Sequence, residues 1–249
     1  MGIGMIDAFR SGAKSLGLII KLAFVNFVLS LINVGGIMSI IQFSGFRVNF
    51  MFTLPTVIPT LWDFIGMDPV NGVSINPGNV LLSALYVVVA AFLQYFYIYY
   101  MIRRLINPSI GVSGRRLIDI FLYNAILLAV VLMIMFTYIG TASMPLTTLL
   151  IILYLIAYYF IYGTPYIVVL RNAGLREALN AAVKTAVNGD YLTFTILYGL
   201  ITLVLSPVMS AIAYGGKIIG IIVASAMAAP IGLWLSASTL MMMNHLIKP

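Results

Sequence analysis

The amino-acid sequence predicts an all-α protein, a polytopic transmembrane helical bundle of about six spans arranged as three hairpins with cytoplasmic amphipathic helices. The first observation behind this prediction is composition: 63% of the 249 residues are hydrophobic and 8% are charged, whereas about 25% are charged in soluble domains. The second is length, since the apolar residues fall in blocks of about 20 or more, enough to cross about 30 Å of hydrocarbon. We therefore expect a single integral membrane domain over residues 1–249.

Six apolar segments are expected to span the membrane. They lie at about residues 18–42, 79–102, 119–139, 146–170, 192–213 and 218–243. The connections Gly140–Pro145 and Tyr214–Lys217 are so short that the spans on either side of each must form antiparallel hairpins. An even number of spans places both termini on the same side of the membrane.

The basic residues are divided unevenly between the two sides of this predicted bundle. Eleven of the 13 lie on the side of the termini, namely Arg10, Lys14, Lys21, Arg103, Arg104, Arg115, Arg116, Arg171, Arg176, Lys184 and Lys248. Because Lys and Arg favour cytoplasmic loops, we expect a multi-pass protein of the cell (plasma) membrane with both termini in the cytoplasm. The net charge of +7 would then lie on the inner face, where anionic lipids attract it by about 1 kcal/mol per basic residue.

The longest connection is the outer loop at about residues 43–78. Pro55 and Pro59 exclude a regular helix interior there. Its apolar residues and Trp62 suit a segment that lies in the headgroup region. A re-entrant loop that is shielded from lipid is the alternative.

Two amphipathic helices are expected beside the membrane, at residues 3–17 and 173–188. In both, apolar residues recur at helical spacing along one face and charged residues along another. Residues Asp7–Ser15 of the first align with Glu177–Thr185 of the second, and residues 113–119 are a third, weaker copy. Since each copy precedes a span that opens an outward-going hairpin, we expect three parallel repeats of one helix-plus-hairpin unit.

The second amphipathic helix also carries a resemblance to a known family. Residues Gly163–Tyr191 contain a proline near the end of the fourth span, a Glu-Ala-Leu helix and an Asn-Gly turn into the fifth. This stretch resembles the six-helix membrane domain attached to some bacterial glycerophosphodiester phosphodiesterases, and its uncharacterised stand-alone relatives in archaea and bacteria. The resemblance implies a prokaryotic membrane fold rather than an activity. The lack of cysteine and the abundance of isoleucine and tyrosine are compatible with a thermophilic source.

The sequence offers few groups for chemistry. It contains no cysteine and one histidine, so we expect no metal site, no cofactor and no enzymatic activity. Inside the predicted spans, one candidate polar pocket is formed by Tyr154, Tyr158, Tyr162, Asn124 and Gln94. The three tyrosines share a helix face, although simple interhelical packing accounts for the same residues.

These observations favour a non-enzymatic membrane protein that acts as a scaffold, an accessory subunit or a membrane-organising element. Its expected partners are anionic lipids on the cytoplasmic face, with a protein subunit or a second copy of the chain as further possibilities, and no nucleic acid. The candidate contacts to headgroups or a partner are Arg10, Lys14, Arg103, Arg104, Arg115, Arg116, Arg176 and Lys184. The alternative function is a transporter or channel for a small neutral or amphiphilic solute.

Overall fold

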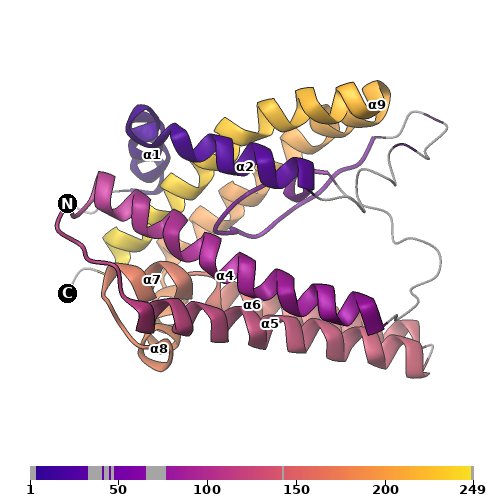
Figure 1. The fold of residues 1–249 in the computed structure, drawn as a ribbon, viewed down its shortest axis with the longest axis horizontal. Helices are drawn as coiled ribbons and strands as arrows, with labels where there is room; N and C mark the ends of the chain where they lie inside the picture. Colours follow the sequence, from indigo (N-terminus) through magenta and orange to yellow (C-terminus); the bar gives the residue numbers. More distant parts are fainter. Residues whose placement is uncertain are drawn as a thin grey trace. The chain divides into compact units, whose positions relative to one another are not determined.

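The computed structural model describes residues 4–32, 41, 45, 48–65, 77–141 and 143–247 (Figure 1). All regular structure in these ranges is helical, as the sequence predicts. The elements are α1 (Met5–Ile19), α2 (Lys21–Ile32), the 3-10 helix η1 (Leu61–Asp63), α4 (Pro77–Leu105), α5 (Gly114–Thr141), α6 (Met144–Ile161), α7 (Thr164–Leu170), α8 (Leu175–Ala186) and α9 (Gly189–Leu246).

Several of these helices have the length and apolarity of membrane spans. Three qualify among the described residues, at Gly114–Thr137, Met144–Leu170 and Gly189–Leu246. A fourth is added if the helices Ile6–Ile19 and Lys21–Ile32, which are bent by 92°, count as one broken span. The structure therefore supports a membrane protein, whereas the count of six spans and their orientation stay predictions.

The chain divides into two compact units where the sequence predicts one domain. Unit 1 comprises residues 1–70, 101–108 and 188–249, and unit 2 comprises residues 71–100 and 109–187. Unit 1 thus contains α1, α2, η1 and α9, while unit 2 contains α5 to α8 and most of α4.

Helix α9 reverses direction at Lys217, the last residue of the short connection predicted from the sequence. Lys217 has non-helical angles, φ 49° and ψ −127°, and a Cβ on Gly220 would clash with the Ile212 carbonyl oxygen. The ring of Phe9 contacts both Phe194 (4.8 Å) and Trp234 (5.5 Å). In a straight helix those two residues would be about 60 Å apart, so α9 consists of two arms, residues 189–216 and 218–246, that run back along each other (Figure 1).

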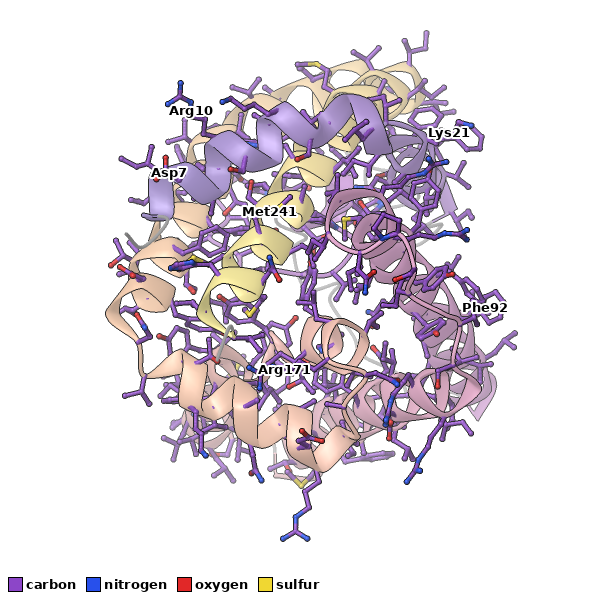
Figure 2. All side chains as sticks on the ribbon, turned by 90° about the vertical axis from the view of Figure 1, so that its left-hand side faces the viewer. Asp7, Arg10, Lys21, Phe92, Arg171 and Met241 are labelled. Carbon is purple, nitrogen blue, oxygen red and sulfur yellow. The ribbon has the colours of Figure 1, made fainter. Side chains whose placement is uncertain are left out.

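Helix α1 packs against both ends of α9 within unit 1. The indole N–H of Trp234 donates to the Phe9 carbonyl at 2.9 Å, and Gly12 approaches Ser238 so closely that any Cβ there would clash. Figure 2 shows Asp7 and Arg10 on the side of α1 that faces away from the arm bearing Met241. This helix occupies the position of the predicted amphipathic helix 3–17, and its charged side is exposed.

The described part of the predicted outer loop lies among the helices of unit 1. Residues 48–60 are not helical, and they lead into η1. Leu61, Phe64 and Ile65 are fully buried in the core that includes α9. The segment is therefore packed against helices, and its position relative to the membrane, interfacial or re-entrant, stays a prediction.

In unit 2, side chains of one helix form hydrogen bonds to neighbouring helices. The Asn124 amide of α5 donates to Gln94 of α4 at 2.9 Å, and the Tyr159 hydroxyl of α6 donates to the Ala186 carbonyl of α8 at 2.8 Å. Residues 113–119, predicted as a third amphipathic copy, instead belong to the start of α5, which begins at Gly114 and continues without a break. No turn separates these residues from the apolar helix, and the three-fold repeat stays a prediction.

Candidate functional site

The turn between α7 and α8 borders a concave surface of unit 2. Helix α7 ends in a Schellman motif, in which the Ala173 N–H donates to the Val168 carbonyl (3.2 Å) and the Asn172 N–H to the Val169 carbonyl (3.4 Å). Asn172 has a left-handed φ of 51°, which asparagine tolerates better than most residues. The turn redirects the chain into α8, the predicted amphipathic helix.

Arg116 fixes this turn against the first turn of α5. Its Nε donates to the Asn172 side-chain carbonyl at 2.8 Å, and its Nη1 forms an ion pair with Asp119 at 3.0 Å. A Cβ on Gly174, the residue before α8, would lie 3.7 Å from the same Nη1, so the guanidinium group is close to the start of α8. One guanidinium group therefore positions the start of α8 relative to α5.

A cleft of about 740 Å³ opens between these elements. Its lining residues are Arg115, Asp119, Arg171, Gly174, Leu175, Arg176, Glu177, Asn180, Ala181 and Lys184. Four of them are basic and two are acidic, and Asp119 is already paired with Arg116. The cleft is consequently positive, and its charged side chains reach the solvent at the entrance.

The inward face of α8 explains how its charged residues come to line the cleft. Ala178, Ala182 and Ala186 recur at every fourth residue and are buried. Small side chains let the helix approach its neighbours closely, so the remaining faces stay open. Val183 and Val187 are 43% and 77% exposed on the outside of α8.

The structure brings together only some of the predicted headgroup contacts. Arg115, Arg176 and Lys184 line the cleft. Arg116 does not, because its guanidinium is engaged by Asp119 and Asn172. The other predicted contacts lie elsewhere and are exposed: Arg10 and Lys14 on α1, and Arg103 and Arg104 in the last turn of α4.

Sequence reasoning missed Arg171 and Asn180 as members of this site. Arg171, labelled in Figure 2, follows α7 directly. Its position just before the amphipathic helix was a usable signal, because a basic residue at the end of a span and one at the start of the next helix share one membrane surface. Asn180 was visible as one of the polar residues on α8, without any feature that marked it as part of a cleft.

The residues of the predicted polar pocket contact one another in two ways within unit 2. The ring of Tyr158 stacks on Tyr154 (centroids 6.0 Å apart) and lies tilted against Tyr162 (6.4 Å), which directly follows α6. Asn124 of α5 and Gln94 of α4 form an interhelical hydrogen bond with each other. The pocket and the binding of a solute in it stay predictions.

Among the described residues, no group of three or more His, Cys, Asp or Glu side chains is placed to hold a metal ion. The resemblance to the membrane domain of glycerophosphodiester phosphodiesterases stays a prediction as well. Comparisons with protein families, with curated proteins and with solved structures find no match to this chain.

Proposed function

We propose that this chain is a non-enzymatic multi-pass membrane protein that binds anionic lipid headgroups in the basic cleft of unit 2. The cleft is the observation that carries the proposal. In this function the protein has six spans, lies in the cell membrane with both termini in the cytoplasm, and presents the cleft to the inner leaflet. Holding such lipids around itself makes it a membrane-organising scaffold or an accessory subunit.

The chemistry of the cleft suits a phosphate group. Arg115, Arg171 and Arg176 contribute guanidinium groups, which bind phosphate oxygens in a bidentate manner. The cleft also contains the first residues of α8, and the N-terminal end of a helix favours an anion. A volume of about 740 Å³ lies within the usual range for small-molecule sites, about 300–1,000 Å³.

The surroundings of the cleft suit a membrane surface rather than open water. Val183 and Val187 are exposed on α8, next in sequence to the cleft residue Lys184 and one turn beyond it. Ile118 is 59% exposed on α5, beside Asp119 of the cleft. A basic helix with exposed apolar residues lies in the interface of an anionic membrane, its apolar side chains among the acyl chains.

Native mass spectrometry of the purified full chain tests this proposal. The detergent-solubilised protein is titrated with dioleoyl phosphatidylglycerol and, separately, with dioleoyl phosphatidylcholine. We expect tighter binding of the anionic lipid. Arg176→Gln together with Lys184→Gln should weaken that binding about 30-fold, since each basic residue contributes about 1 kcal/mol.

Arg103→Gln together with Arg104→Gln is the matched control. It removes the same charge from the last turn of α4, outside the cleft. We expect it to weaken binding by less than about threefold, because these arginines act only through the general field of the protein. Equal losses in the two double variants, or equal binding of the two lipids, would refute a specific headgroup site.

Transport of a small neutral or amphiphilic solute is a second candidate function. It is favoured by the extended segment, residues 48–60, which is packed among the helices of unit 1. Non-helical backbone among membrane helices is tolerated where it is buried in protein or lines a passage.

A further inference from the structure

The extended segment 48–60 is held by a polar stripe on the first arm of α9. The stripe consists of Thr202, Ser206, Ser210 and Tyr214, which recur at every fourth residue. The Thr53 N–H donates to the Thr202 hydroxyl at 3.2 Å. The Ser206 hydroxyl accepts from the Met51 N–H and donates to the Asn49 carbonyl, both at 2.8 Å. The segment therefore runs along this arm, its backbone bound by side chains rather than by another strand.

The second arm of α9 and helix α2 bind the other end of the segment. The Ser236 hydroxyl donates to the Val57 carbonyl at 3.0 Å, and the Asn26 amide donates to the Pro59 carbonyl at 3.0 Å. A Cβ on Gly232 would lie 2.6 Å from that same carbonyl oxygen, so only glycine leaves room for the backbone of the segment. The segment is thus enclosed by three helical stretches.

Five oxygen atoms in this region are buried without a hydrogen-bond partner in the structure. They are Asn26 Oδ1, Thr53 Oγ1, Thr56 Oγ1, Ser210 Oγ and Ser225 Oγ. Each such group costs about 1–3 kcal/mol if it stays unpaired, and buried polar groups in folded proteins are nearly always paired. Because they lie on the segment and on the helices that hold it, these atoms could bind a polar molecule there.

Two of these atoms, Ser210 Oγ and Ser225 Oγ, lie on the two arms of α9. Ser210 lies in the polar stripe, one turn after Ser206, which binds the segment. Ser225 lies two helical turns before Gly232, on the same face of the second arm. Since the chain reverses at Lys217, Ser210 and Ser225 lie at similar levels on the two arms, roughly 10 and 12 Å along the helix from the reversal.

We infer that segment 48–60, together with these polar groups of α2 and α9, forms a binding site for a small uncharged solute that carries several hydroxyl groups. This inference rests on the second candidate function, transport. Residues 48–60 include no charged side chain, so nothing in the segment compensates an ion. Hydroxyl groups both donate and accept, and the Asn26 Oδ1 atom accepts, which matches the paired donors and acceptors of a polyol.

Osmotic swelling of proteoliposomes tests the site with glycerol as the probe. The full chain is reconstituted, and glycerol entry is followed by stopped-flow light scattering against protein-free liposomes. We expect protein-dependent glycerol entry, and a fall of at least tenfold in Thr53→Val together with Thr56→Val. Valine keeps the shape of threonine and removes only the hydroxyl. Thr193→Val is the control, because the Thr193 hydroxyl lies on the exposed side of α9, and entry should be unchanged.

Stability measurements on the same variants separate a binding role from a structural one. Thr53→Val with Thr56→Val should unfold at the same temperature as the wild type or higher, since it removes two unpaired buried hydroxyls. Ser206→Ala should unfold at a lower temperature, because it breaks two hydrogen bonds to the segment. A loss of stability in the double variant equal to that of Ser206→Ala would show that the hydroxyls are structural, and would overturn the inference.

The remaining outcomes are equally decisive. Unchanged glycerol entry in the double valine variant would place the passage elsewhere and overturn the site. A wild-type protein that admits water but no glycerol would show that the unpaired oxygens bind water alone. Absence of any protein-dependent entry would refute transport itself. Phosphatidylglycerol binding, measured on the same preparation, depends on unit 2, so its presence or loss reports separately on the headgroup proposal.

Discussion

The left-handed conformation of Asn172 allows a sharp test of how the basic cleft is built. Asn172→Ala removes the side-chain carbonyl that accepts from Arg116 at 2.8 Å, and it places alanine, which tolerates the left-handed region less well than asparagine, at φ 51°. The lost hydrogen bond costs about 1 kcal/mol at an exposed position. The left-handed conformation adds about 1 kcal/mol for alanine. The α7–α8 turn should therefore open about 30-fold more often than in the wild type.

Asn172→Gly is the matched variant. It loses the same hydrogen bond, but glycine adopts a positive φ without a steric cost. We expect a loss of about 1 kcal/mol, or about fivefold in the opening equilibrium. The difference between the two variants isolates the conformational contribution of the turn.

The assay uses the absence of cysteine from the chain. Ala182→Cys introduces a single thiol at a fully buried position of α8, and its rate of labelling reports how often α8 separates from its neighbours. Intrinsic fluorescence would not serve, because Trp62 and Trp234 both belong to unit 1. Equal labelling rates for the alanine and glycine variants would refute the reasoning, since the backbone conformation would then contribute nothing.

Two further predictions concern unit 1. Gly232→Ala should lower the free energy of unfolding by about 1–3 kcal/mol, because its Cβ would lie 2.6 Å from the Pro59 carbonyl oxygen. Gly215→Ala is the control, and it should be neutral or stabilising, since a Cβ there meets open space. Thermal unfolding of the two variants and the wild type measures the difference. Burial raises the pKa of the Asp63 carboxyl group above its ordinary value of 3.8, although hydrogen bonds from Thr60 oppose the shift. The stability that depends on protonated Asp63 is therefore fully present below pH 3.8. It is lost as the pH rises through the raised pKa. The unfolding temperature of the wild type should therefore fall between about pH 4 and 7 relative to that of Asp63→Asn, which cannot ionise at this position. An equal pH dependence of the two proteins would show that the carboxyl group is hydrated and would contradict the prediction.

The positions of the helices follow from the sequence because the length of an apolar block is a local property. The predicted segment 79–102 corresponds to α4, Pro77–Leu105. The predicted break between the fifth and sixth segments is at Lys217, the residue with non-helical angles. Glycine at positions 215 and 216 before a charged residue marks such a turn without any knowledge of the tertiary structure.

The path of the extended segment could not be predicted in the same way. Pro55 and Pro59 exclude a helix, but they do not say which surface the chain follows. That path depends on hydrogen bonds between residues far apart in the sequence. Thr53 and Thr202 are separated by 149 positions, and Val57 and Ser236 by 179 positions. Hydroxyl groups inside apolar helices have many local uses, including bonds to their own backbone, so the sequence alone does not identify their partners.

The basic cleft could be predicted from the sequence only in part. Charge asymmetry pointed to Arg115, Arg176 and Lys184, because basic residues mark one membrane surface wherever they occur. The cleft itself depends on the turn at Asn172 and on the engagement of Arg116. Both are details of side-chain geometry that the sequence does not reveal. From the sequence alone, Arg116 is therefore indistinguishable from the basic residues that line the cleft.

The way in which segment 48–60 is bound has a consequence for how this sequence can vary during evolution. The hydroxyl groups of Thr202, Ser206 and Ser236 contact backbone atoms of the segment, and every residue type except proline supplies the same N–H and carbonyl groups. Selection for this architecture therefore acts on the helices. Homologous chains that keep the fold should retain hydroxyl residues at those three helical positions, while the side chains of the segment, apart from Thr53 and Thr56 of the inferred site, vary freely.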